Sequence, residues 1–160
     1  MKKALYSGSS LIALSAAFAV FAAAPVALGE AVGVTGAVNP SATGTPPGAA
    51  TRPLVLGSEV VFNERIVTGA DGQAHVLFLD QSSMIVGPNS TVVIDQFVYD
   101  PRANTGQMAA TLTRGTLRFI GGKLSQQGAA TLRTPVATIG IRGTDVGVTH
   151  EETTTNVRVG

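Results

Sequence analysis

Apolar residues in this chain recur in short runs with a period of two, and Gly or Pro interrupts the chain after almost every run. Beyond residue 30, no window of eleven residues keeps apolar side chains at helical spacing without a Gly or Pro inside it. The 19 Gly and 8 Pro among the 160 residues supply these frequent turns. The pattern predicts strands, with at most one short helical turn.

About ten short strands are expected, in one all-β domain with little helix, sandwich-like or solenoid-like. The segment 76–79 is apolar on both faces and predicts a central buried strand, whereas 41–53 is expected to be a loop and Asp71-Gly72 a hairpin turn. The strand candidates cover residues 32–38, 60–67, 73–79, 84–86, 91–94, 109–112, 116–120, 129–134, 136–141, 145–149 and 156–159.

The first 29 residues are typical of a secretory signal peptide. Lys2 and Lys3 precede an apolar segment over 11–24, and a small-x-small cleavage site ends at Gly29. We therefore expect a signal peptide over 1–29 and the all-β domain over 30–160. The alternative is an uncleaved anchor, because 11–28 approaches the roughly 20 residues that span a bilayer, and membrane contact is expected only in that case.

The absence of cysteine excludes a disulfide framework, Cys-ligated metal sites and thiol catalysis. Together with the signal segment, this composition favours a secreted bacterial protein of the periplasm or the cell surface. The formal net charge of +1 and the 5% aromatic content give no support to nucleic acid as a partner.

The charges are unevenly distributed along the chain. Residues 53–100 carry six acidic side chains and one basic one, whereas 101–144 carry six basic side chains and no acidic one. We expect the two segments to pair in the fold. The alternative is a basic face that binds a polyanion such as lipopolysaccharide or an acidic partner.

Catalytic arrangements find little support in the residue inventory. A Ser-His-Asp arrangement needs His75 to meet a hydroxyl and one of Asp71, Asp80 or Asp95, and nothing in their spacing predicts this. Asp80 and Asp95 could approach each other across a hairpin, but glycoside chemistry is normally found in an aromatic cleft. The acids also lack calcium-loop spacing. We expect no catalytic residues, metal or cofactor, and His75 to be a partly exposed strand residue.

Gly140-Ile141-Arg142-Gly143 has the spacing of a nucleic-acid clamp, but that clamp lies between two helices, whereas the pattern from Pro135 onward predicts a strand. Gly140 and Gly143 are expected to allow a bulge or a close backbone approach. Arg142 beside them is expected to be partly buried and paired with an internal carboxylate. The alternative is an exposed anion contact.

Several segments resemble, in the same order, the FecR protein domain over roughly residues 57–149. The matching segments are 67–69 (VTG), 74–82 (AHVLFLDQS), 87–90 (GPNS), 94–95 (ID), 114–118 (RGTLR) and 134–144 (TPVATIGIRGT). One departure is Gln81, where the family usually carries Gly in an Asp-Gly-Ser turn. The residues of these motifs, expected to be structural, are Asp80, Ser82, Asn89, Gly115, Thr134, Pro135, Gly140, Arg142, Gly143 and Thr144.

The resemblance implies an extracytoplasmic all-β domain that takes part in sensing and protein recognition. The founding members span the membrane and relay the occupancy of an outer-membrane ferric-siderophore transporter to a cytoplasmic sigma factor. Here a signal-like segment precedes the domain, so the sigma-factor role is not expected to carry over.

Two functions remain open. The first is a non-catalytic FecR-like interaction or sensing module, a signalling component whose protein-binding partner is another envelope or surface protein. The alternative is the first domain of a structural or adhesive bacterial surface protein. An enzyme, as a carbohydrate-active domain, ranks third.

The exported protein is expected to begin at Glu30, because Ala27-Leu28-Gly29 combines small residues with a tolerable residue after the cut, whereas cleavage after Ala24 would leave Pro25 first. The intact mass of the protein recovered from the producing cell tests this. A mass that retains residues 1–29 would contradict it and indicate a membrane-anchored protein.

Overall fold

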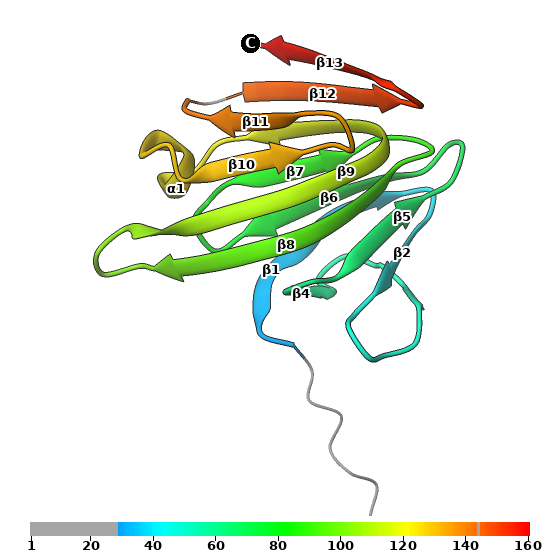
Figure 1. The fold of residues 1–160 in the computed structure, drawn as a ribbon. Helices are drawn as coiled ribbons and strands as arrows, with labels where there is room; N and C mark the ends of the chain where they lie inside the picture. The colour runs from blue at the N-terminus through cyan, green and yellow to red at the C-terminus, as the bar shows by residue number, and fades with distance from the viewer. Residues whose placement is uncertain (1–28, 144) are drawn as a thin grey trace, which may run out of the picture.

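The longest strand of the fold, β9 (Thr105–Ile120), takes part in both halves of a curled sheet (Figure 1). In this computed structural model, which describes residues 29–143 and 145–160, the first part of β9 pairs with β8 (Thr91–Asp100) and with β10 (Ala130–Arg133). From Gly115 onward, β9 pairs with β7 (Ser83–Val86) and β12 (Asp145–Glu151). One strand therefore joins two layers.

The first layer has the order β4-β1-β6-β7-β9-β12-β13, in which the further strands are β4 (Glu59–Val61), β1 (Ala31–Asn39), β6 (Gln73–Phe78) and β13 (Thr154–Val159). The second layer has the order β3-β2-β5-β8-β9-β10-β11, with β3 (Arg52–Pro53), β2 (Ala42–Thr45), β5 (Arg65–Thr68) and β11 (Thr138–Ile141). Pairing is antiparallel except between β9 and β10, which the crossover through the short helix α1 (Lys123–Gln126) makes parallel.

The two layers bury one apolar face each. The rings of Phe78 in β6 and Phe97 in β8 stack between the layers, with centroids 5.4 Å apart. The core is formed by Val32, Ala42, Leu54, Val60, Ile66, Ala74, Val76, Phe78, Met84, Val86, Val92, Ile94, Phe97, Met108, Ala110, Leu112, Leu117, Phe119, Leu124, Ala130, Leu132, Ile141, Val146 and Val148. Among the described residues, no helix is long and apolar enough to cross a membrane.

The expectation of an all-β domain with one short helical turn is confirmed, but the described residues form thirteen strands rather than about ten. The segment 41–53 is not a plain loop, because it contains β2 and β3. The candidates at 109–112 and 116–120 are parts of the single strand β9. The predicted signal segment lies, apart from Gly29, outside the described residues.

Two local expectations are wrong. Asp71-Gly72 is a turn, but it leads from β5 in one layer to β6 in the other, so the flanking strands form no hairpin. β6 is central between β1 and β7, yet only one of its faces is buried: Val76 is buried, while Leu77 is 41% exposed. Apolar residues on both faces therefore indicated a central strand without indicating a second covering layer.

A buried carboxylate joins β4 to the strands of the second layer. Glu64 is fully buried, accepts the Val61 N–H at 2.9 Å on Oε2, and pairs with Arg52 Nη2 at 3.0 Å through Oε1. A Cβ at Gly44 would lie 2.1 Å from Glu64 Oε1, so glycine makes room for this carboxylate. Burial raises the pKa of Glu64, against the opposing effects of the Val61 N–H and Arg52.

Replacing Glu64 by Gln is expected to change how stability depends on pH. Because the folded-state pKa is raised, the protonated carboxyl contributes stability that is present at low pH and is lost as the pH rises through that pKa. The unfolding free energy of the wild type relative to Glu64→Gln should therefore fall as the pH rises above the ordinary glutamate pKa of about 4.3, as measured by urea titration.

Glu59→Gln in the exposed part of β4 controls for the loss of one negative charge. A difference between wild type and Glu64→Gln that rises with pH would contradict the role given to burial.

Candidate functional site

The buried Asp80 connects the turn after β6 to helix α1 through hydrogen bonds, and we call this set of contacts the α1 joint. Its Oδ1 accepts hydrogen bonds from the Ser82 N–H at 3.1 Å and the Ser82 hydroxyl at 2.5 Å. Its Oδ2 accepts the Leu124 N–H at 3.2 Å, and its main-chain oxygen accepts the Lys123 N–H at 2.9 Å. Four donors therefore hold Asp80, which ties the turn to the first residues of α1.

Gln81, between these two motif residues, has a left-handed backbone with φ of +68°. An L-residue with a Cβ adopts this conformation at a cost that glycine avoids. The structure thus explains why a glycine suits this position in the FecR pattern. The turn nevertheless forms in this chain, because Asp80 and Ser82 hold it from both sides.

Ser125 of α1 extends the joint to the turn between β11 and β12. Its hydroxyl donates toward the main-chain oxygens of Gly122 and Gly143, each at 3.0 Å. A Cβ at Gly121 would lie 2.2 Å from the Gly143 oxygen, so these segments touch backbone to backbone. Gly143 itself has φ of +134°. Three segments distant in the sequence therefore meet at one end of the sheet.

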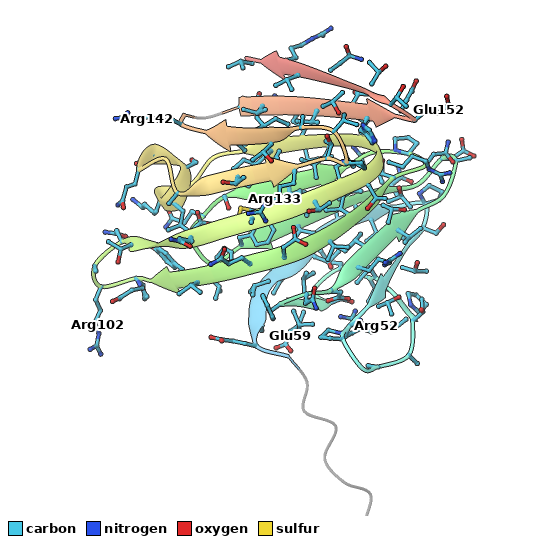
Figure 2. All side chains as sticks on the ribbon, viewed as in Figure 1. Arg52, Glu59, Arg102, Arg133, Arg142 and Glu152 are labelled. Atoms are coloured by element: carbon cyan, nitrogen blue, oxygen red, sulfur yellow. The ribbon has the colours of Figure 1, made fainter. Side chains whose placement is uncertain are left out.

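Arg142 lies in this turn, and the expectation that it is buried and paired is wrong. The side chain is exposed, and none of the ion pairs between described residues includes it. Figure 2 shows it directed away from the body of the molecule. Nothing lies within 4 Å of a Cβ built at Gly140 or Gly143, so neither glycine is needed to make room for a neighbouring segment. Gly143 instead adopts a positive φ that other residues rarely adopt.

Thr134 and Pro135 form a turn, so the strand expected from residue 136 begins only at Thr138. The Thr134 hydroxyl accepts the N–H groups of Val136 at 3.4 Å and Ala137 at 3.0 Å. It also lies 2.8 Å from the Thr155 hydroxyl, which lies 2.9 Å from Nδ1 of the buried His150. This chain of polar groups links the β10–β11 turn to the β12–β13 hairpin. His150 is thus a member of the site that the sequence did not indicate.

Asn89 and Gly115 occupy the corner where β9 bends. Asn89 is exposed with φ of +50°, and its main-chain oxygen accepts from Arg114 Nε at 3.3 Å. Gly115 has φ of +98°, and a Cβ there would lie 2.2 Å from Ser90 Oγ. The Ser90 hydroxyl in turn accepts the Thr116 N–H at 2.8 Å. Both motif residues therefore allow the main chain to turn at this corner. Thr144, the last motif residue, lies outside the described part of the chain.

Among the described residues, the expected pairing between the acidic and basic segments is limited to one long contact, between Asp95 and Arg133 at 3.9 Å. Arg118 instead binds Asp145, which follows the basic segment, with Nε at 3.0 and 3.2 Å from the two carboxylate oxygens. This hydrogen-bonded pair lowers the pKa of Asp145. The basic side chains are therefore largely left on the surface.

The residues considered for catalysis do not converge. His75 is a partly exposed residue of β6, as expected. Asp80 is held at the α1 joint, whereas Asp95 in β8 accepts from the Thr111 hydroxyl at 2.6 Å. Within residues 29–143 and 145–160, no three His, Cys, Asp or Glu side chains are grouped so that they could hold a metal ion.

Replacing Gln81 by Gly is expected to stabilise the protein by about 0.5 to 1 kcal/mol, because it relieves the left-handed backbone. Gln73→Gly in β6 is the matched control, and should lose a similar amount because the strand there has no positive φ. Urea titration measures both. Equal losses in the two variants would show that residue 81 carries no backbone strain.

No curated protein matches the chain. One solved structure, described as a cell surface anchoring domain, is 28% identical and covers 39% of this chain and 83% of its own, with a TM-score of 0.38. The family model described as FecR protein matches residues 64–160, more than half of the chain. The chain therefore belongs to the FecR protein family.

Proposed function

We propose that the domain is a non-catalytic, extracytoplasmic recognition module in which the turn around Arg142 contacts an acidic surface of another envelope protein. The exposure of Arg142 on a turn held in place carries this proposal. A recognition residue needs a free side chain on a rigid support, because ordering a mobile loop would cost binding energy.

The support comes from the contacts behind the turn. Ser125 and Gly121 pack against the Gly143 main chain, and Asp80 fixes α1 in turn. The partly exposed Lys123, at the start of α1, and the exposed Arg142 thus lie on segments that are joined to each other. Neither forms an ion pair with a described residue, so both are available to a partner.

The polar motif residues support recognition rather than chemistry. The Asp80 carboxylate accepts three hydrogen bonds and is buried, so its lone pairs are used by the fold. The Thr134 hydroxyl is used in the same way. Membership of the FecR family further favours a sensing or surface role over an enzyme.

Crosslinking in the producing cell, followed by mass spectrometry of the captured proteins, tests the proposal with Arg142→Met. Met keeps much of the apolar stem and removes the guanidinium. Capture of the envelope partner should fall several-fold, while the free energy of unfolding changes by less than about 0.5 kcal/mol because the side chain is exposed.

Arg102→Met is the matched control, since Arg102 is an exposed arginine in the turn between β8 and β9 (Figure 2). It should leave capture unchanged. Equal capture by wild type and Arg142→Met would refute the role of this turn, and a loss of several kcal/mol would restore a buried structural role for Arg142.

A further inference from the structure

The outermost strand of the first layer, β13, is the longest of the described strands that have a single neighbouring strand (Figure 1). The strands β3, β4, β11 and β13 each have a single neighbour. The first three contain two, three and four residues, and β3 includes Pro53. β13 has six residues and no proline.

The main-chain groups along this edge are regularly spaced. The Gly160 N–H donates to the Asp145 oxygen of β12, in line with the pairing of Val146 with Val159. In an antiparallel pair, the residues that bond to the neighbour alternate with residues whose N–H and C=O point away. Thr155, Val157 and Val159 therefore direct their N–H and C=O groups away from β12, where no described strand receives them.

The side chains of the same residues form an unfinished apolar row. Val157 and Val159 lie opposite Val148 and Val146 of β12, which are buried. Yet Val157 is 46% exposed and Val159 is 75% exposed. The inner face of the first layer thus continues onto β13, although little of the second layer covers it there.

β13 also lacks the features that protect free edges. Proteins usually blunt such edges with proline, a bulge or an inward-pointing charge. The pairing of β12 with β13 runs without a register shift, and the one charged residue of β13, Arg158, lies opposite Gly147 on the outer face. An added strand would meet no obstacle.

We propose that β13 pairs antiparallel with β13 of a second copy, around a two-fold axis through Val157. In this register Val157 faces its own counterpart, Thr155 faces Val159, and Asn156 faces Arg158. All three outward-pointing residues of each strand gain partners, and no like charges meet. On the inner face, Leu117, Val148 and Val157 lie side by side on β9, β12 and β13. In the dimer this apolar row continues across the contact with Val157, Val148 and Leu117 of the second copy.

The neighbouring registers are worse. An axis through Arg158 would place the two guanidinium groups opposite each other. An axis through Asn156 would leave Val159 opposite Thr153, which lies in the turn between β12 and β13 and not in a strand. The pattern of charges and hydrogen-bonding groups therefore selects Val157.

This inference goes beyond the proposed function, because it concerns the purified protein alone and involves the free edge of β13 rather than the turn around Arg142. The exported form should give twice the monomer mass in light scattering and in sedimentation equilibrium at high micromolar concentration. A monomer under these conditions would overturn the proposal, and so would open-ended polymers, which a two-fold contact cannot form.

Val157→Pro separates edge pairing from folding. The Val157 N–H points away from β12, so proline removes no bond of the β12–β13 ladder but removes the central bonds between the copies. We expect a folded monomer whose melting midpoint, unlike that of the wild type, does not depend on protein concentration. Val157→Ile, which keeps the N–H and the apolar row, is the control and should remain dimeric. A Val157→Pro variant that stays dimeric would place the contact elsewhere.

A single cysteine tests the register, since the natural chain has none. Residues that face each other in a bonded antiparallel pair have Cα atoms about 5.5 Å apart, within reach of a disulfide. Val157→Cys should crosslink to a dimer under mild oxidation. Val34→Cys, a 41% exposed site on β1 between two strands, should not. Equal crosslinking at both sites would contradict the two-fold register.

Discussion

Both layers depend on one strand, because β9 is the only described strand that both layers share. Before the bend, Met108, Ala110 and Leu112 face the core; after it, Leu117 and Phe119 do so. The inward positions change from even to odd numbers, and the left-handed backbone of Gly115 accommodates this change. Any side chain at residue 115 would strike Ser90, so the bend, and with it the facing of the two layers, requires glycine there.

The bend in β9 brings the two layers face to face, with the apolar core between them. The turns at the ends of the strands lie outside this core, so polar contacts must hold them together. Asp80 holds α1, Ser125 holds the Gly143 turn, and Thr134 reaches Thr155. Each contact satisfies main-chain or hydroxyl groups that would otherwise be buried without partners. Among the FecR motif residues, Asp80, Thr134 and Gly143 thus take part in contacts between segments that are distant in the chain.

The same construction leaves two surfaces without internal partners. At the α1 end, the joint fixes the main chain around Arg142 and leaves its guanidinium in solvent. Beside it, the first layer ends at β13 with a row of main-chain groups and half-exposed valines. A charged turn favours selective contact with an acidic partner, whereas an open edge favours the addition of a strand. The two surfaces differ in chemistry and can be occupied independently.

The sequence by itself determined most of the strands and the positions of many turns, because a period of two and the placement of Gly, Asn and Asp are local properties. It also separated β9 into two candidates, since its pattern slips by one residue at Gly115. Tertiary structure alone decided that Arg142 is exposed, that β2 and β3 add to the second layer, and that His150 joins Thr155. The burial and the hydrogen-bond partners of a residue depend on which other strand packs against it. That strand comes from a distant part of the chain, so local sequence does not identify it.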